Sequence, residues 1–327
     1  MVINKVEEFI KTHNLITPGT SVILGFSGGP DSTFLLHMLA QLQCSQQFTL
    51  IAAHLNHGWR AEAEDDLFFC QQMTEKLNVP FVHAHARDFT GKVKFNGSQE
   101  DLGRRMRRLF FSQLLREHQT TNAHPARIAL AHHQDDQYET FFIRLARGSG
   151  LEGLAGMRPL HGDYIRPLLG LSKSEIIAYL NANNIPFKLD ASNSHAEKYL
   201  RSRIRTMALP LLANCDKRFP AILQNTMGNL AEANDFVNEI VQETFAKLVE
   251  HKEDHMTLDL SKLFTLHPYL QKRILLHWIC EEGVPFTPSQ GFFQEIERFL
   301  HQHRDGDHLI NQTWHIKKRN GQASIIS

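Results

Sequence analysis

The segment Ser27-Gly28-Gly29-Pro30-Asp31-Ser32 combines residue types that suit phosphate binding. It follows the apolar run 22–24 and precedes an apolar-periodic run that begins at Phe34, which predicts a strand, a glycine-rich turn and a helix. Glycines let the backbone approach a phosphate closely, and a helix N-terminus offers free N–H groups and the positive end of its dipole. The hydroxyls of Ser27 and Ser32 add donors. Because no Lys follows the glycines, the usual triphosphate-hydrolase loop is absent, and the segment predicts a phosphate site of another kind.

Two further polar groups follow predicted strands. The segment from His54 to Arg60 follows the run 49–55, and His132-His133-Gln134-Asp135-Asp136 follows the run 127–131. Ligands of parallel sheets bind beyond the C-terminal ends of the strands, so we expect both groups at the same edge as the glycine-rich turn. Asp31 would repel phosphates as a free charge, and its predicted use is to hold Mg²⁺ directly or through water. The alternative is an acidic residue that the helix dipole favours.

The elements that must position these residues follow an α/β pattern over residues 1–217. Strands are predicted at 21–25, 49–55, 81–86 and 127–131, and helices at about 31–42, 61–77, 98–118 and 135–147. Strands separated by helices of this length predict right-handed crossovers and a parallel, Rossmann-like sheet.

From about residue 218 the pattern changes to long helices, near 222–250, 260–280 and 292–301, with a short strand or hairpin at 313–319. We therefore predict a nucleotide-binding catalytic domain over residues 1–217. A smaller, mainly helical domain that binds the substrate follows over residues 218–327.

Length and composition narrow the class of protein. The 327 residues suit two domains, and a hydrophobic content of 42% with a charged content of 21% is typical of a soluble globular protein. No run approaches the roughly 20 apolar residues of a membrane helix, so no membrane partner is expected. The four cysteines form no C-x-x-C pair, which disfavours a zinc or iron–sulfur site built on such pairs and predicts a cytoplasmic protein. The formal net charge of +0 neither indicates nor excludes a nucleic-acid partner.

Several segments together carry a family resemblance. The glycine-rich turn resembles the S-G-G-x-D-S signature of the PP-loop ATP pyrophosphatases. With four more segments in order, the chain resembles the tRNA(Ile)-lysidine synthase family, densely over residues 20–215 and loosely over 255–320. The four segments are 54–60 (HLNHGWR), 131–140 (AHHQDDQYET), 147–157 (RGSGLEGLAGM), and 190–193 (DASN) with 199–205 (YLRSRIR).

The resemblance implies a two-step reaction. Enzymes of this family use ATP and Mg²⁺ to adenylate the C2 oxygen of the wobble cytidine in the CAU anticodon of tRNA(Ile). The ε-amine of free L-lysine then displaces AMP and gives lysidine. The implied partners are therefore tRNA(Ile) and L-lysine, and a homodimer is an arrangement that the sequence leaves open.

The resemblance also implies roles for individual residues. Ser27, Gly28, Gly29, Pro30, Asp31 and Ser32 would bind the pyrophosphate of ATP, with His54 and Arg60 beside them. Asp135 or Asp136 would bind the lysine ammonium and accept its proton, and which of the two faces the amine is open. We favour Asp31, His133 and Asp136 as the catalytic set, although a histidine at a strand end is as often bonded only to backbone.

Basic residues are the candidates for tRNA contact. Arg104-Arg105-Met106-Arg107-Arg108 is the densest basic cluster, and Arg104 shares a helix face with Arg107 and Arg108. The alternative for this cluster is a set of solvated arginines. Arg201 and Arg205 are further candidates for substrate or tRNA contact. The family pattern A-R-x-x-R-Y is altered here, because Gly103 and Arg108 stand at its two ends.

Three other functions compete with this interpretation. Another PP-loop tRNA-modifying enzyme, such as a cytidine thiolase, is the first alternative, but thiolases that depend on a metal cluster bring C-x-x-C pairs. A PP-loop amidotransferase would need a glutaminase domain, of which no signature is visible. A non-catalytic nucleotide- or RNA-binding module would not need Asp31, Asp135 and Asp136, all of which are present.

Overall fold

The computed structural model describes residues 2–59, 61–89, 91, 99–121, 124–189, 199–252, 255–286 and 290–327. The chain divides into two compact units, Met1–Met227 and Gly228–Ser327. The division falls within helix α10 (Phe219–Leu248), and the domain boundary predicted after residue 217 stays a prediction.

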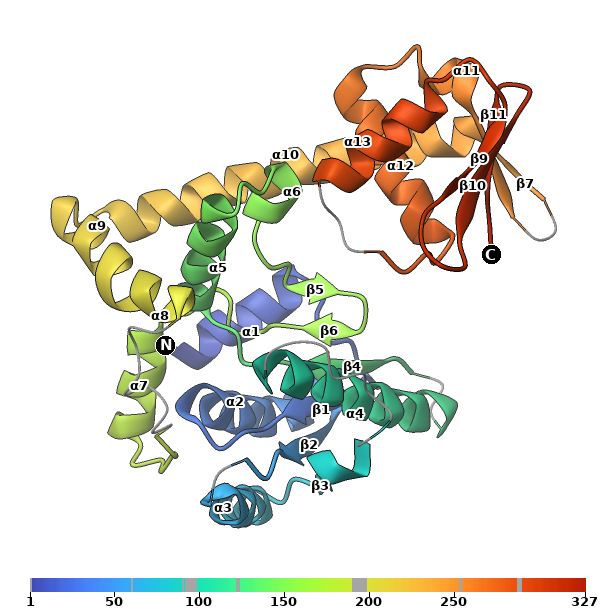
Figure 1. The fold of residues 1–327 in the computed structure, drawn as a ribbon. Coiled ribbons are helices and arrows are strands. Elements are labelled where there is room, and N and C mark those ends of the chain that lie inside the picture. The colour runs from blue at the N-terminus through green and yellow to red at the C-terminus, as the bar shows by residue number, and fades with distance from the viewer. Residues whose placement is uncertain are drawn as a thin grey trace. The chain divides into compact units, whose positions relative to one another are not determined.

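The first unit is built on a six-stranded sheet with the order β3-β2-β1-β4-β6-β5 (Figure 1). The pairs β1–β2, β1–β4, β2–β3 and β4–β6 are parallel. Among the described strands of this sheet, only the pair β5–β6 is antiparallel. The predicted parallel sheet is therefore confirmed. Its strands are β1 (Ser21–Gly25), β2 (Thr49–Asn56), β3 (Phe81–His85), β4 (Ala126–Ala129), β5 (Leu160–His161) and β6 (Tyr164–Ile165).

Helices cover both faces of this sheet (Figure 1). The helical elements of the first unit are α1 (Val2–Thr12), α2 (Pro30–Gln46), α3 (Ala63–Lys76), the 3-10 turn η1 (Ala86–Phe89), α4 (Gln99–Thr121), α5 (Gln134–Ala146), α6 (Leu151–Leu154), α7 (Lys173–Ala182), α8 (Leu200–Arg203), the π-helical turn η3 (Ile204–Ala208) and α9 (Leu209–Cys215). The first part of α10 completes the unit.

The alternation of side chains along β1 shows how the two faces are filled. Val22 and Leu24 lie in the apolar core shared with α1, α2 and α7. Ile23 points to the other face, where it joins the core under α4. All three side chains are fully buried, as a strand covered by helices on both faces requires. This central strand carries the glycine-rich turn at its C-terminal end.

The second unit joins helices to an antiparallel sheet with the order β7-β8-β11-β10-β9. Its core is centred on the fully buried Trp278. Its helices, beyond the remainder of α10, are α11 (Leu260–Leu263), α12 (Pro268–Glu281) and α13 (Gln290–Leu300). Its strands are β7 (Val249–His251), β8 (Met256–Asp259), β9 (Gly306–Leu309), β10 (His315–Arg319) and β11 (Gln322–Ile326).

Two local predictions differ from the structure. The predicted helix 260–280 is broken into α11 and α12, because Pro268 occupies the first position of α12. The glycine-rich segment after α5 lies outside the predicted helices, yet it contains the short helix α6. That segment is packed closely against α5, since the Arg144 guanidinium donates to the carbonyls of Gly153 and Gly156.

In the part of the chain that the structure describes, no helix combines the length and the apolar character needed to cross a lipid bilayer.

Candidate active site

The turn between β1 and α2 has the geometry of an anion cradle. Gly28 has a φ of +77°, and a Cβ atom at this position would also lie 3.2 Å from the Cys70 Sγ atom. The Ser32 hydroxyl accepts a hydrogen bond from the Ser27 backbone N–H at 3.2 Å and lies 3.0 Å from the Ser27 hydroxyl. Pro30 begins the helix, whose first N–H groups have no carbonyl partner within it. The Ser32 hydroxyl itself donates to the Gly29 carbonyl at 3.1 Å, so the turn offers mainly the backbone N–H groups at the helix N-terminus.

His54 and Cys70 are buried beside this turn. His54 is buried, and its Nδ1 atom lies 2.8 Å from the Phe26 carbonyl oxygen. The Cys70 Sγ atom lies 3.6 Å from the same ring nitrogen. Burial lowers the pKa of His54 and raises the pKa of Cys70 to about 12, so both are neutral near pH 7. Here His54 holds the strand end that precedes the turn, and its predicted contact with the nucleotide stays a prediction.

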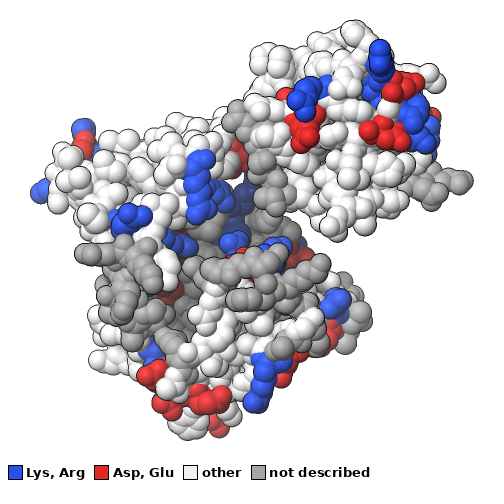
Figure 2. All heavy atoms as spheres, in the orientation of Figure 1, with Lys and Arg blue, Asp and Glu red and all other residues white. Residues whose placement is uncertain are grey.

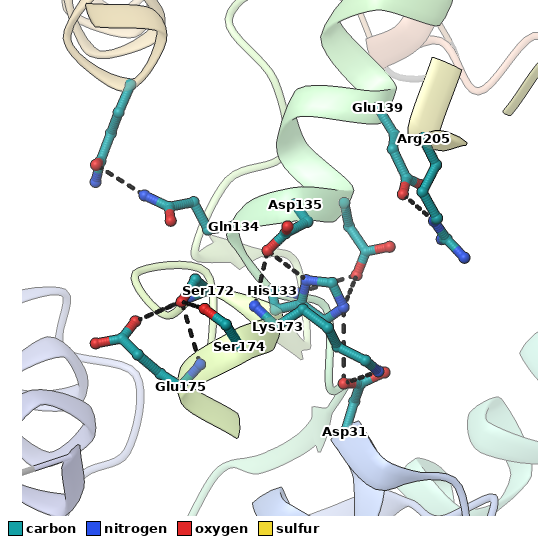
Figure 3. A network of polar contacts seen from close by, with 12 residues as sticks. Asp31, His133, Gln134, Asp135, Glu139, Ser172, Lys173, Ser174, Glu175 and Arg205 are labelled. Atoms are coloured by element: carbon teal, nitrogen blue, oxygen red, sulfur yellow. Dashed lines mark hydrogen bonds and ion pairs between the residues drawn. The ribbon is translucent and has the colours of Figure 1, made fainter. Parts of the chain in front are cut away.

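Three carboxylates surround His133 at the edge of the sheet where β1 and β4 end (Figure 3). The His133 Nε2 atom lies 3.7 Å from Asp31 and 3.5 Å from Asp136, and its Nδ1 atom lies 3.6 Å from Asp135. Asp136 accepts a hydrogen bond from the His133 backbone N–H at 3.1 Å, which caps α5. The residues predicted to be catalytic, Asp31, His133 and Asp136, are thus brought together, with Asp135 beside them.

A cation that was not predicted enters this group from α7. Lys173 Nζ donates to the Asp31 carboxylate at 2.5 Å, and the Lys173 backbone N–H donates to Asp135 at 2.8 Å (Figure 3). Lys173 follows β6, whose C-terminal end lies at the same sheet edge. This residue is not among the predicted site residues, because the short strand β6 that precedes it was not predicted from the sequence.

The two adjacent histidines are in opposite electrostatic environments. The pKa of His132 is lowered to about 4, mainly by burial. The charges of Arg166 and Arg201 also lower it, while that of Asp136 raises it. Burial would also lower the pKa of His133, but the three carboxylates outweigh it and the net shift is upward. Burial opposes ionisation of Asp135, yet His133 and the Lys173 backbone N–H lower its pKa. Near pH 6, His132 is therefore neutral while His133 is mostly protonated.

We predict that the two histidines titrate separately in the free protein without Mg²⁺. The His132 ring should titrate near pH 4 and the His133 ring above its usual pKa of about 6.5. For His132 the unfolded chain binds the proton more tightly, so its contribution to stability is lost as the pH falls from about 6.5 to 4. Histidine-selective ¹H–¹⁵N NMR checks this, with His132→Gln and His133→Gln for assignment. Titration of both rings at the same pH would contradict the different environments assigned to His132 and His133.

Glu139 is a buried carboxylate that sequence analysis did not single out. Its side chain has no exposed surface, yet it pairs with Arg201 at 2.6 Å and with Arg205. Arg201 also donates to Asp136 at 2.8 Å. Hydrogen bonding to Glu139 raises the pKa of Arg205. Glu139 lies one helical turn after Asp135 and Asp136, and this spacing was the available signal.

The remaining predicted residues are dispersed. Arg104, Arg107 and Arg108 are exposed on α4. Arg201 and Arg205 are also exposed, although both pair with the buried Glu139. Arg60 and the segment 190–193 lie outside the described residues.

With this geometry established, comparison with known proteins defines the class. Residues 1–212 match the PP-loop domain model, and the chain belongs to the PP-loop domain family. Residues 258–323 match the TilS substrate binding domain. Among its relatives, the chain is similar to the tRNA(Ile)-lysidine synthases, which confirms the resemblance found in the sequence.

Two relatives and one solved structure illustrate the extent of the similarity. The tRNA(Ile)-lysidine synthase of Bacillus cereus is 30% identical over 307 residues, which are 91% of this chain and 63% of the relative. The tRNA(Ile)-lysidine synthase of Geobacillus kaustophilus is 34% identical over 288 residues, which are 84% of this chain and 59% of the relative. The chain thus spans less than two thirds of the length of these relatives. The U34-tRNA thiolase NcsA from Methanococcus maripaludis has a TM-score of 0.57 at 16% identity, over 71% of this chain and 78% of that chain, and shares the fold alone.

Proposed function

We propose that this protein is an ATP-dependent ligase that joins L-lysine to C2 of the wobble cytidine in the CAU anticodon of tRNA(Ile). The observation that carries the proposal is the group of Asp31, His133, Asp135 and Asp136 beside the PP-loop, in a chain that also matches the TilS substrate binding domain. ATP, L-lysine and tRNA(Ile) are the proposed substrates.

In the first step the C2 oxygen of cytidine attacks the α-phosphorus of ATP. The new O–P bond forms as the bond from the α-phosphorus to the bridging oxygen breaks, and pyrophosphate leaves. The residues at 27–32 and the N-terminus of α2 stabilise the negative charge of the departing pyrophosphate. Lys173 adds a positive charge beside Asp31. This step needs positioning and charge neutralisation, which these groups supply, rather than a protein nucleophile.

In the second step the ε-amine of lysine attacks C2, and AMP leaves with the C2 oxygen. Free lysine is mostly protonated at pH 7, so the amine must lose a proton before it attacks. The carboxylates of Asp135 and Asp136 attract the ammonium and one of them accepts this proton. Asp135 has the more exposed side chain, at 43% against 14% for Asp136, whereas Asp136 is tied to Arg201.

Asp31 is the proposed ligand of Mg²⁺. In the described part of the chain, no three His, Cys, Asp or Glu side chains form a group that could hold a metal ion. Proteins commonly bind Mg²⁺ through one or two carboxylates together with phosphate oxygens of the substrate. Asp31 is partly exposed at the start of α2, next to the loop. When bound, the ion would offset negative charge on the phosphates.

Formation of AMP and pyrophosphate tests the proposal. The protein is incubated with ATP, Mg²⁺ and unmodified tRNA carrying the CAU anticodon, with and without L-lysine. We expect AMP release to require both tRNA and lysine. AMP release that needs a sulfur donor instead of lysine would identify a thiolase, the alternative drawn from the sequence, and would contradict the proposal.

The surface of the first unit supports a polyanionic partner. On the face drawn in Figure 2, many of the visible acidic side chains of this unit lie over α3, whereas mainly basic side chains lie over α5 and α8. On α4, Arg104 and Arg107 are exposed, while Arg105 is paired with Asp101 at 2.8 Å.

We predict that Arg104→Gln with Arg107→Gln weakens tRNA binding. Affinity for tRNA decreases as salt rises, and the steepness of log affinity against log salt concentration should decrease by about one for each phosphate contact that is lost. Arg105→Gln removes the same charge from the same helix at a position already paired with an acid, and serves as the control. Filter binding of tRNA at several salt concentrations measures the slopes. A slope in the double variant equal to that of the wild type would show that these arginines are only solvated.

A further inference from the structure

An aromatic pair with an exposed indole and a partly buried imidazole lies between β2 and α3, at the sheet edge of the PP-loop. The rings of His57 and Trp59 are stacked, with centroids 4.5 Å apart and planes inclined by 23°. Trp59 is 41% exposed. The turn that presents the pair is fixed by Asn56, whose side-chain oxygen accepts a hydrogen bond from the Gly58 backbone N–H at 2.8 Å. The indole is therefore held in place on one side and open to solvent on the other.

Gly103 in the second turn of α4 provides the seat for this indole. A Cβ atom on Gly103 would lie 2.7 Å from the Trp59 Cη2 atom and 3.2 Å from the His57 ring. Glycine destabilises a helix interior relative to alanine. Its presence here is explained by the space that the ring requires. The two residues form one feature, although they are far apart in the sequence.

The helix α4 carries exposed arginines beside this seat. Arg104 and Arg107 are exposed on α4, within one turn of Gly103. In addition to burial, the charge of Arg104 lowers the pKa of both Arg144 and Arg166. The Arg104 guanidinium therefore lies close enough to those of Arg144 and Arg166 to repel both, although Glu152 offsets part of this at Arg144. Such an arrangement is stabilised when an anion binds among them.

We propose that Trp59 is a stacking platform for an unpaired base of the RNA substrate, whose phosphates lie along the arginines of α4. This inference rests on the proposed function only in taking RNA as the substrate. Base–aromatic stacking beside a basic surface is how proteins bind single-stranded nucleic acid. The charge favours RNA over the adenine of ATP, because RNA brings a phosphate with each base while ATP places its phosphates on the loop at 27–32.

Intrinsic fluorescence tests the stacking directly. The sequence contains three tryptophans, and Trp278 is fully buried in the second unit. An anticodon stem-loop RNA should quench the emission of the wild-type protein, and the Trp59→Leu variant should lose most of this quenching. Quenching by ATP alone that disappears in the variant would assign the platform to adenine and overturn the proposal.

Affinity provides the second readout. Trp59→Leu should weaken binding of the stem-loop by about 5- to 100-fold, whereas Trp59→Phe should retain most of the affinity because a ring remains. Gly103→Ala keeps every charge and every ring but displaces the indole, and should also weaken binding. Phe68→Ala, at an exposed aromatic residue on α3, is the matched control and should bind normally.

The outcomes separate this inference from the proposed reaction. Quenching by RNA without any transfer of lysine would support the platform and contradict the reaction. Transfer of lysine by a Trp59→Leu variant that binds RNA as tightly as the wild type would overturn the platform alone.

Discussion

Asp31→Asn is expected to lower the rate of tRNA adenylation by at least about 100-fold, on the scale of removing one group that stabilises a developing charge. The substitution keeps the size of the side chain but removes the charge that pairs with Lys173 at 2.5 Å. It also removes one of the three carboxylates around His133. Loss of this charge at the start of α2 takes away the proposed Mg²⁺ ligand and leaves Lys173 without its partner. Transfer of labelled AMP from ATP to tRNA measures the effect.

A matched control separates this effect from loss of helix-dipole stabilisation. Asp65→Asn also removes an acid from the first turn of a helix in the same unit, but its side chain is exposed on α3. It should transfer AMP at the wild-type rate. Thermal unfolding of the Asp31→Asn variant should stay close to that of the wild type, because Lys173 and Asp31 are both partly exposed and their ion pair contributes little to stability. Wild-type AMP transfer by Asp31→Asn would refute the assignment.

Glu139→Gln is expected to have the largest effect on stability. Glu139 is completely buried and is the shared partner of Arg201 and Arg205. Its neutral replacement leaves Arg205 with one weak acceptor, whereas Arg201 keeps its ion pair with Asp136. Since both arginines are about half exposed, solvent screens part of the loss, and we expect the free energy of unfolding to fall by about 1–3 kcal/mol. The same pairs hold α8 and η3 against α5, so lysine transfer should fall as well. Urea unfolding of the whole chain measures the first effect.

The control for this variant is Glu75→Gln, an equal change at an exposed position on α3. It should leave both stability and lysine transfer within experimental error. If Glu139→Gln were as stable as this control, the ion pairs of Glu139 would be of no consequence for the fold.

The first unit was largely predictable because its signals are local. Apolar runs such as 22–24 are buried on both faces of a parallel sheet, and the helices between them follow the ordinary periodicity. The rule that ligands bind at the C-terminal ends of strands predicts from the sequence that Asp31 and the group at 132–136 lie at one edge of the sheet. The structure places these residues within ion-pair distance of one another.

The features that the sequence did not predict depend on contacts between segments that are far apart along the chain. Arg201 and Glu139 are 62 residues apart, and Lys173 is 142 residues from Asp31. No periodicity connects such positions, because a pair of this kind depends on how whole elements meet. Arg201 and Arg205 were likewise predicted to contact substrate or tRNA, and their ion pairs with Glu139 were not predicted. The second sheet was mostly missed, since strands such as β9 (Gly306–Leu309) are short and lack apolar alternation.

The central claim is that the protein attaches lysine to a tRNA base with ATP. The most direct test supplies labelled L-lysine, ATP and Mg²⁺ with unmodified tRNA(Ile) carrying the CAU anticodon, and then exposes the product to mild alkali. We predict label that survives alkali, because a C–N bond to the base resists hydrolysis whereas an aminoacyl ester does not. Absence of alkali-stable label, from protein shown to be folded, would contradict the account.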